Sequence, residues 1–333
     1  MPNRSLDSRG TFSTLVGVRV KNRLLKTALL AALFILFNNS HADEVRIAVA
    51  YPEVREPYNQ VFVALLEGIS SAGNYKTVAY TLTADTKSEA FIKWVEEQNV
   101  SGIVALGNRG MSLAREIQGD MKLPLVVGGT FINGSGSGLQ VPAVSMAPMP
   151  LNLFKKLKEL NPKATKVNVV YEAEDKWLIE IAQKAAEEIG IQLNAVAATD
   201  IRALAAAYQT ILKTQKSKSE ALWLPYSGKS LEKALMNEVL EMAWRHDLTV
   251  FSSNLADVSK GVLFSLYPDN DLSGKRLAKL LFAKADVTDG PESTLFLSED
   301  LFAALNTRTV EHLGMRLDQE ERSNYKILFP LKR

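Results

Sequence analysis

The chain has 333 residues, of which 47% are hydrophobic and 23% charged, and it contains no cysteine. This composition is typical of a soluble globular protein, and the length allows two domains with hydrophobic cores. The formal net charge is +2, but residues 1–42 hold six of the Lys and Arg residues and only one acid. The remainder therefore has 33 bases against 36 acids, and this mildly acidic balance argues against a nucleic-acid-binding protein.

The first 42 residues have the three parts of a secretory signal peptide. A basic segment, "KNRLLK", precedes the apolar run "TALLAALFILF", and Ser40, His41 and Ala42 form a small-x-small cleavage site. As a helix this run would rise only about 16 Å against a hydrocarbon core of roughly 30 Å, so a membrane anchor is the weaker interpretation. The sequence therefore predicts a signal peptide cut after Ala42 and a periplasmic protein. With no cysteine, its stability must come from packing rather than disulfides.

Apolar, strand-like runs alternate with amphipathic, helix-like segments along the rest of the chain. In the first half, strands are expected at 45–51, 76–82, 102–107 and 123–129. After a stretch rich in glycine and proline, the alternation restarts with strands at 166–171, 220–226 and 248–253. Such alternation predicts parallel sheets with helices on both faces. The predicted fold class is therefore α/β, with two doubly wound parallel-sheet lobes.

The ends of these predicted strands carry polar, aromatic and glycine residues. In open α/β sheets, ligands bind outside the carboxyl ends of the strands. The predicted ligand-binding residues are accordingly Tyr51, Asn108, Arg109, Gly129, Thr130, Tyr171, Glu172, Tyr226, Ser227, Ser253 and Asn254. These groups can orient a small polar ligand, but they are poor in groups that could cleave one.

The turn "GNRG" at 107–110 joins an apolar strand to the start of a helix. Its glycines allow close backbone approach, and Arg109 either grips a ligand carboxylate with two parallel bonds or is solvated at the rim. The pattern is neither G-x-x-x-x-G-K-[ST] nor G-x-G-x-x-G, so it does not indicate a nucleotide phosphate loop. The other candidates also have plain alternatives, because Gly129 can serve only a turn, a tyrosine can be packing, and Glu172 can be solvated.

The sequence shows no set of residues that would carry out catalysis. After the signal peptide only His246 and His312 remain, neither at a predicted strand end, and no cluster has the spacing of metal ligands. The "GSGSG" at 134–138 precedes no helix and cannot form a nucleophile elbow. We therefore expect no enzymatic activity, no metal and no cofactor.

Several stretches, in order, resemble the ABC transporter substrate-binding protein family with a periplasmic binding protein type I-like fold. They are "GIVALGNRG", "LPLVVGGT", "LKELNPKATKVNVVYEAE" and "LTVFSSNLADVSKGVLFSLYPDNDLSGKRLAKLL". Within the family, they are similar to the broad group that includes tryptophan- and tyrosine-type binders. The resemblance implies two lobes joined by a three-segment hinge, with a ligand in the cleft between them. It assigns 43–148 plus 268–291 to lobe 1 and 149–267 plus 292–333 to lobe 2.

The sequence also departs from that group at its ligand loops. Asn108 and Arg109 stand where a small hydroxyl residue and proline are common, "GTFINGSG" replaces an Asp-Pro pair, and "EAEDKW" replaces a Ser/Asn-rich loop. The ligand class, amino-acid-like or other, therefore stays open. The expected function is transport: a monomeric solute-binding protein that passes a small polar ligand to an ABC permease in the inner membrane. The alternative is a ligand-sensing accessory protein for a membrane kinase or cyclase.

Overall fold

The computed structural model describes residues 45–56, 58–134, 138–216, 218–226, 233–283 and 295–331. The predicted signal peptide and Ser227 lie outside these ranges. The chain divides into two units, Met1–Glu44 and Val45–Arg333, and the sheets and helices described all belong to the second. Within the described ranges, no helix has the length and apolar character needed to cross a bilayer.

A six-stranded sheet forms the first lobe, with all neighbouring strands parallel and the order β11-β5-β4-β3-β1-β2. The strands are β1 (Val45–Pro52), β2 (Tyr75–Leu82), β3 (Gly102–Leu106), β4 (Leu125–Thr130), β5 (Ala143–Pro148) and β11 (Leu295–Ser298). The helices are α2 (Asn59–Ser71), α3 (Ser88–Gln98), α4 (Gly107–Ile117) and α10 (Asn270–Phe282).

Alternate residues of β1 show how this sheet is covered on both faces. Ile47 and Val49 pack with α2 and α10, whereas Ala48 and Ala50 pack with α3 and α4. Successive side chains of a strand point to opposite faces, so a strand buried on both sides reads as a continuous apolar run. This is why the run at 45–51 predicts the strand without showing alternation.

The second lobe contains a seven-stranded sheet of order β13-β12-β10-β9-β8-β6-β7. Its strands are β6 (Lys166–Glu172), β7 (Gln192–Ala198), β8 (Glu220–Leu224), β9 (Thr249–Ser252), β10 (Phe264–Pro268), β12 (Leu301–Asn306) and β13 (Ile327–Phe329). Its longer helices are α5 (Pro150–Leu160), α6 (Lys176–Glu188), α7 (Ile201–Thr214) and α8 (Lys233–Arg245). Short helices are η1 (Ala173–Asp175), α9 (Leu255–Lys260), α11 (Thr307–His312) and α12 (Gln319–Ser323).

The predicted fold class, α/β with two doubly wound lobes, is confirmed. Helices α5 and α6 cover one face of the second sheet, and α7 and α8 cover the other. The last two strands differ from the expectation of parallel sheets, because β12 runs antiparallel to β10 and β13 runs parallel to β12. Only two residues separate β11 of the first sheet from β12 of the second, so the chain crosses between the sheets here without an intervening helix.

The two sheets are joined by three neighbouring crossings, after Pro148, after Pro268 and after Ser298. The Met149 N–H donates to the Ser298 carbonyl at 2.9 Å, and the Asp269 N–H donates to the Asp300 carbonyl at 3.0 Å. The third crossing lies later than the expected boundary at 292, because β11 pairs with β5 in the first sheet. An apolar run identifies a strand, but it does not show which sheet edge the strand joins.

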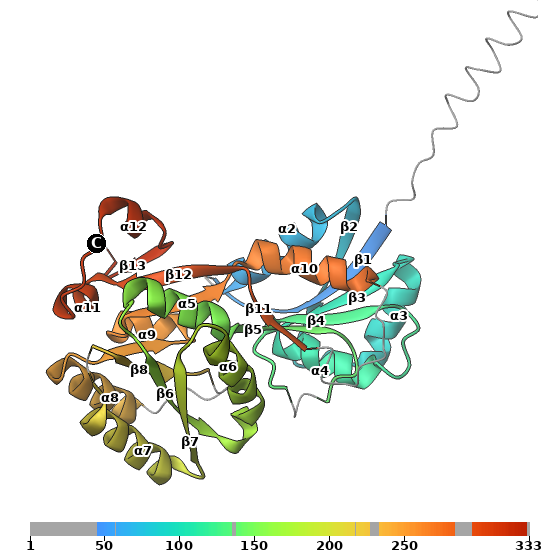
Figure 1. The fold of residues 1–333 in the computed structure, drawn as a ribbon. Helices are drawn as coiled ribbons and strands as arrows, with labels where there is room; N and C mark the ends of the chain where they lie inside the picture. Colours follow the sequence, from blue (N-terminus) through green and yellow to red (C-terminus); the bar gives the residue numbers. More distant parts are fainter. Residues whose placement is uncertain are drawn as a thin grey trace, which may run out of the picture. The chain divides into compact units, whose positions relative to one another are not determined.

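Helix α10 follows a strand of the second sheet, yet it packs against α2 on the first (Figure 1). The contact depends on two glycines that face the opposite backbone. A Cβ at Gly68 would lie 2.0 Å from the Asp271 carbonyl oxygen, and one at Gly274 would lie 2.2 Å from the Leu65 carbonyl oxygen. The two helix backbones therefore approach closely only because neither position has a side chain.

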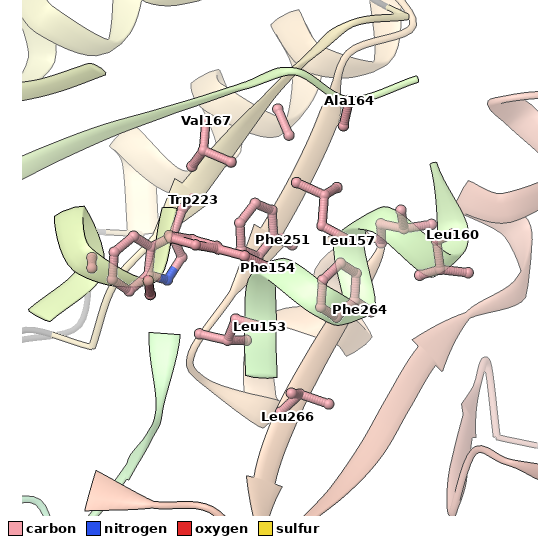
Figure 2. Close-up of a cluster of buried hydrophobic side chains, with 14 of the residues drawn as sticks. Leu153, Phe154, Leu157, Leu160, Ala164, Val167, Trp223, Phe251, Phe264 and Leu266 are labelled. Carbon is pink, nitrogen blue, oxygen red and sulfur yellow. The ribbon is translucent and has the colours of Figure 1, made fainter. Parts of the chain in front are cut away.

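The largest core cluster lies under α5 and α6, and Figure 2 shows part of it. Trp223 of β8 is fully buried, and its ring meets Phe154 of α5 edge-on, with 5.5 Å between centroids. The rings of Phe251 and Phe264, from neighbouring strands, stack at 5.1 Å. Trp223 and Phe251 each lie one residue before the end of their strand, so this aromatic packing holds the ends of β8 and β9 in place.

Tyr325, which belongs to the same cluster and is 8% exposed, gives the fold a specific alkaline sensitivity. Burial, together with Glu159 and Glu321, raises its pKa from 10.0 to about 12. The folded chain keeps this proton where the unfolded chain loses it, so the stabilising contribution is complete below pH 10 and is lost as pH rises towards 12. We expect Tyr325→Phe to reduce the slope of unfolding free energy against pH above pH 10, measured by urea denaturation.

The exposed Tyr58 supplies a matched control, because its side chain is 73% accessible. Tyr58→Phe should leave the alkaline slope as in the original chain. Equal slopes for the original chain and Tyr325→Phe would contradict the assignment of this pH dependence to Tyr325.

Candidate functional site

Helix α4 begins at Gly107, directly after β3 ends at Leu106. Gly107 has φ +73°, and a Cβ there would also lie 3.0 Å from the Pro52 ring. No side chain caps this helix start. The turn therefore requires glycine, and it places Asn108 and Arg109 on the exposed first turn of α4.

The ends of β3 and β4 meet through a side-chain hydrogen bond. The buried Thr130 hydroxyl donates to the Asn108 side-chain oxygen. Gly129 has φ +66°, and a Cβ on it would lie 3.5 Å from the Gly107 nitrogen. Because the Asn108 oxygen is engaged, its amide NH2 is the group left to contact a ligand. The structure thus brings together Asn108, Gly129 and Thr130, as a strand-end site requires.

Arg109 lines a hollow of about 300 Å³ between the first turns of α4 and the segment after β2. Thr83, Thr86 and Glu116 also line it, and so does Asn108. The hollow therefore adjoins the Asn108–Thr130 pair. It holds the charges of Arg109 and Glu116, which are opposite in sign, at the edge of the first sheet.

Two aromatic rings link the strand ends of the two sheets. Phe131 directly follows β4 and Tyr226 comes two residues after β8, and their rings stack with centroids 3.4 Å apart and 13° between planes. Burial raises the pKa of the Tyr226 hydroxyl above its ordinary value. Tyr226 was predicted from its strand end, but Phe131 was not. The sequence signal for Phe131 is the stretch "GGTF", in which the aromatic residue directly follows the glycine and hydroxyl residues of the strand end.

Trp177, at the start of α6, is a second aromatic residue that the strand-end rule misses. The position of a Cβ on Gly134 would lie 2.8 Å from its ring, so the segment after β4 also contacts α6. The indole Nε1 is buried and has no hydrogen-bond partner among the described residues. A rule restricted to strand ends overlooks Trp177 because its position is already helical, although it closes the stretch "EAEDKW".

Four predicted residues have structural partners of their own. The Ser253 hydroxyl is 4% exposed and accepts a hydrogen bond from the Trp223 Nε1 at 2.9 Å. The Asn254 side chain accepts from the Ala256 N–H at 3.1 Å and caps α9. Tyr51 stacks on Phe62 of α2 at 6.3 Å, and Tyr171 packs against the cluster around Trp223. Apart from the local Asn254 cap, these contacts join residues from separate elements, so only the tertiary structure shows them.

The remaining predicted positions add little to the geometry. Glu172 is half-buried at the end of β6, and Ser227 lies outside the described residues. His246 is exposed, and His312 contacts Asp247 and Trp244. In the part of the chain that the structure describes, no three His, Cys, Asp or Glu residues are grouped so as to hold a metal ion.

No protein-family model and no curated protein matches the chain. Among solved structures, it is similar to the ligand-free, open form of a substrate-binding protein with adhesive properties from Clostridium difficile. The identity is 15%, with 85% of this chain and 98% of that chain covered and a TM-score of 0.61. This likeness shows that the chain has a periplasmic binding protein type I-like fold.

Two further structures align over most of the chain with lower TM-scores. One is a conserved domain protein from Vibrio cholerae, at 18% identity, with 86% of this chain and 100% of that chain covered and a TM-score of 0.48. The other is an ABC domain in complex with L-Trp from Streptococcus pneumoniae, at 13% identity, with the same coverage and TM-score. The conclusion on fold rests on the first comparison alone.

Proposed function

We propose that this chain is the periplasmic substrate-binding component of an ABC-type transporter, and that it holds a small polar ligand with a flat ring between the strand ends of its two lobes. The observation that carries the proposal is the Phe131–Tyr226 stack. It joins the end of β4 to the end of β8, and Phe131 directly follows Thr130, which is bonded to Asn108. Strand carboxyl ends are the general ligand site of open α/β sheets.

The ring pair implies how such a ligand would be accommodated. Two rings at 3.4 Å are in van der Waals contact, so no ligand fits between them without separating the residues that carry them. Aromatic pairs prefer offset or edge-to-face arrangements, and a near-parallel pair at this distance gains little from ring electrostatics. A flat ligand that enters between the rings would replace the single Phe131–Tyr226 contact by two contacts, one with each ring.

The buried Trp177 Nε1 has no hydrogen-bond partner among the described residues, and we propose that separating the two rings would expose it to the ligand. An unpaired buried donor costs about 1–3 kcal/mol, and a ligand oxygen or nitrogen that accepts its hydrogen would recover that cost. The NH2 of Asn108 and the guanidinium of Arg109 add further donors on the other lobe. A ligand with a flat body and several acceptors therefore suits this set of side chains.

The fold supports solute binding, since the Clostridium difficile protein similar to this chain is described as a substrate-binding protein. Fold alone does not determine function, so the strand-end residues carry the proposal. The basic and apolar segments of residues 1–42 support export to the periplasm. The motif resemblance supports a permease as the partner. No catalytic step is proposed, because the strand ends supply hydrogen-bond donors and rings rather than a nucleophile paired with a base.

The test begins with mass spectrometry of protein purified under native conditions, followed by unfolding, dialysis and refolding to remove any bound molecule. A ligand at 100 times its Kd stabilises the folded state by about 2.7 kcal/mol, so the correct metabolite class should raise the melting temperature by several degrees. Co-purification with a permease would support transport, whereas co-purification with a membrane kinase or cyclase would support sensing.

Tyr226→Ala should weaken binding of the identified ligand about tenfold, because it removes one ring face, a loss of roughly 1.4 kcal/mol. Isothermal titration calorimetry on the stripped protein measures this change. Tyr58→Ala, at an exposed tyrosine, is the matched control and should bind with the original affinity. The proposal fails if no metabolite raises the melting temperature, or if Tyr226→Ala binds as tightly as the control.

A further inference from the structure

A second hollow, of about 460 Å³, lies among elements of the second lobe. It is lined by the last turns of α8, the end of α9 and the start of α11. Two of the lining residues lie at strand ends: Gly261 comes before β10, and Asn306 is the last residue of β12. Because β12 is antiparallel to β10, with Phe264 opposite Leu305, its last residue lies beside the first residues of β10. The hollow is therefore at the amino end of β10, whereas Tyr226 follows the carboxyl end of β8, which is parallel to β9 and β10. It is a separate feature from the strand-end site.

The apolar wall of this hollow is provided by Leu240 and Trp244, which lie on one face of α8 with a spacing of four residues. Trp244 is 48% exposed, an unusual degree for so large an apolar side chain. Its ring stacks on the His312 ring at 3.6 Å with 9° between planes. His312 Nε2 in turn lies 2.8 Å from the Trp244 carbonyl oxygen and 3.0 Å from Asp247 Oδ1. The indole is therefore held in place.

Three charged side chains line the hollow, one from each element. Glu241 of α8 is paired with Arg245, and Lys260 of α9 donates to Asp257 Oδ1 at 2.9 Å. Arg308 of α11 is exposed, and its guanidinium has no hydrogen bond or ion pair with any residue that the structure describes. The hollow thus presents one uncompensated positive charge beside a fixed aromatic ring.

We propose that this hollow is a second ligand site, and that it takes a small organic carboxylate with a flat apolar body. The Arg308 guanidinium would hold the carboxylate with two parallel hydrogen bonds, and the body would lie against Trp244 and Leu240. The volume is within the range of small-molecule sites, about 300–1,000 Å³. Inorganic phosphate or sulfate would satisfy the charge but leave the apolar wall uncovered. The inference does not depend on the ligand of the strand-end site.

Phenylacetate is a suitable probe, because it has a flat ring one methylene from a carboxylate, and phenylacetamide is its neutral counterpart. The indole N–H resonances of 15N-labelled protein are recorded during titration, and that of Trp244 is identified with Trp244→Phe. Phenylacetate should shift the Trp244 resonance saturably. Phenylacetamide should bind at least tenfold more weakly, since hydrogen bonds to charged groups are the stronger ones.

Arg308→Gln should weaken phenylacetate binding at least tenfold, whereas Arg202→Gln, at an exposed arginine of α7, should leave it unchanged. Tyr226→Ala should also leave the Trp244 shift unchanged, which separates this site from the proposed transport site. The inference is overturned if phenylacetate does not move the Trp244 resonance, if it moves that of Trp177 instead, or if Arg308→Gln and Arg202→Gln bind equally.

Discussion

Replacing Gly274 by alanine should lower the free energy of unfolding by about 3 kcal/mol, at the upper end of the range for overpacking. The new Cβ would lie 2.2 Å from the Leu65 carbonyl oxygen and 3.0 Å from the Gly68 Cα. These neighbours are backbone atoms of α2, so no side-chain rotation relieves the overlap. Alanine has a helix propensity about 1 kcal/mol better than glycine, but this gain is smaller than the cost of separating two helices. Urea denaturation followed by circular dichroism measures the change.

Gly119→Ala is the matched control, because a Cβ there meets no atom within 4 Å and the backbone is not left-handed. It should change the free energy of unfolding by less than about 0.5 kcal/mol. If Gly274→Ala were as stable as this control, the close crossing of α2 and α10 would be wrong. The conclusion that α10, which follows β10 of the second sheet, packs on the first sheet would also be wrong.

Trp223→Ala should cost about 4 kcal/mol of unfolding free energy, within the range for truncating a buried aromatic residue. The ring is fully buried and meets Phe154 edge-on, so its removal leaves a cavity beneath α5 (Figure 2). It also leaves the buried Ser253 hydroxyl without its indole donor. Urea denaturation measures the loss of unfolding free energy. The slope of the transition is compared between variants, because an unchanged slope shows that the stability itself has changed.

The Ser253 hydroxyl distinguishes a structural role from a ligand-binding one. Ser253→Ala leaves the Trp223 Nε1 unpaired, so it should cost about 1–3 kcal/mol while ligand affinity stays unchanged. In Trp223→Phe the hydroxyl has already lost its partner, so adding Ser253→Ala should cost much less. A fall in ligand affinity with unchanged stability would contradict the structural role and show that Ser253 contacts the ligand.

These two sites of tight packing explain how the strand-end residues are positioned. The α2–α10 contact holds the segment after β10 on the first sheet, and the Trp223 cluster supports the ends of β8 and β9. Tyr226 lies two residues after the end of β8, and Phe131 lies directly after the end of β4. Gly128 of β4 packs against Leu277 of α10. Each ring therefore lies within two residues of a strand that is packed in a hydrophobic core.

The sequence by itself determined the α/β class, the order of most strands and helices, and the positions where polar groups would stand at strand ends. These properties are local: an apolar run of strand length, an amphipathic period or a glycine turn is complete within a few residues. Asn108, Thr130 and Tyr226 are predicted as candidate site residues in this way.

Only the tertiary structure decided which of those groups meet. It paired Thr130 with Asn108, placed Phe131 on Tyr226, gave Ser253 to the core, and attached β11 to the first sheet. Each of these contacts joins residues far apart in the chain, and their partners are selected by packing and strand pairing across the whole fold. A pattern within one segment carries no information about the segment that it will face.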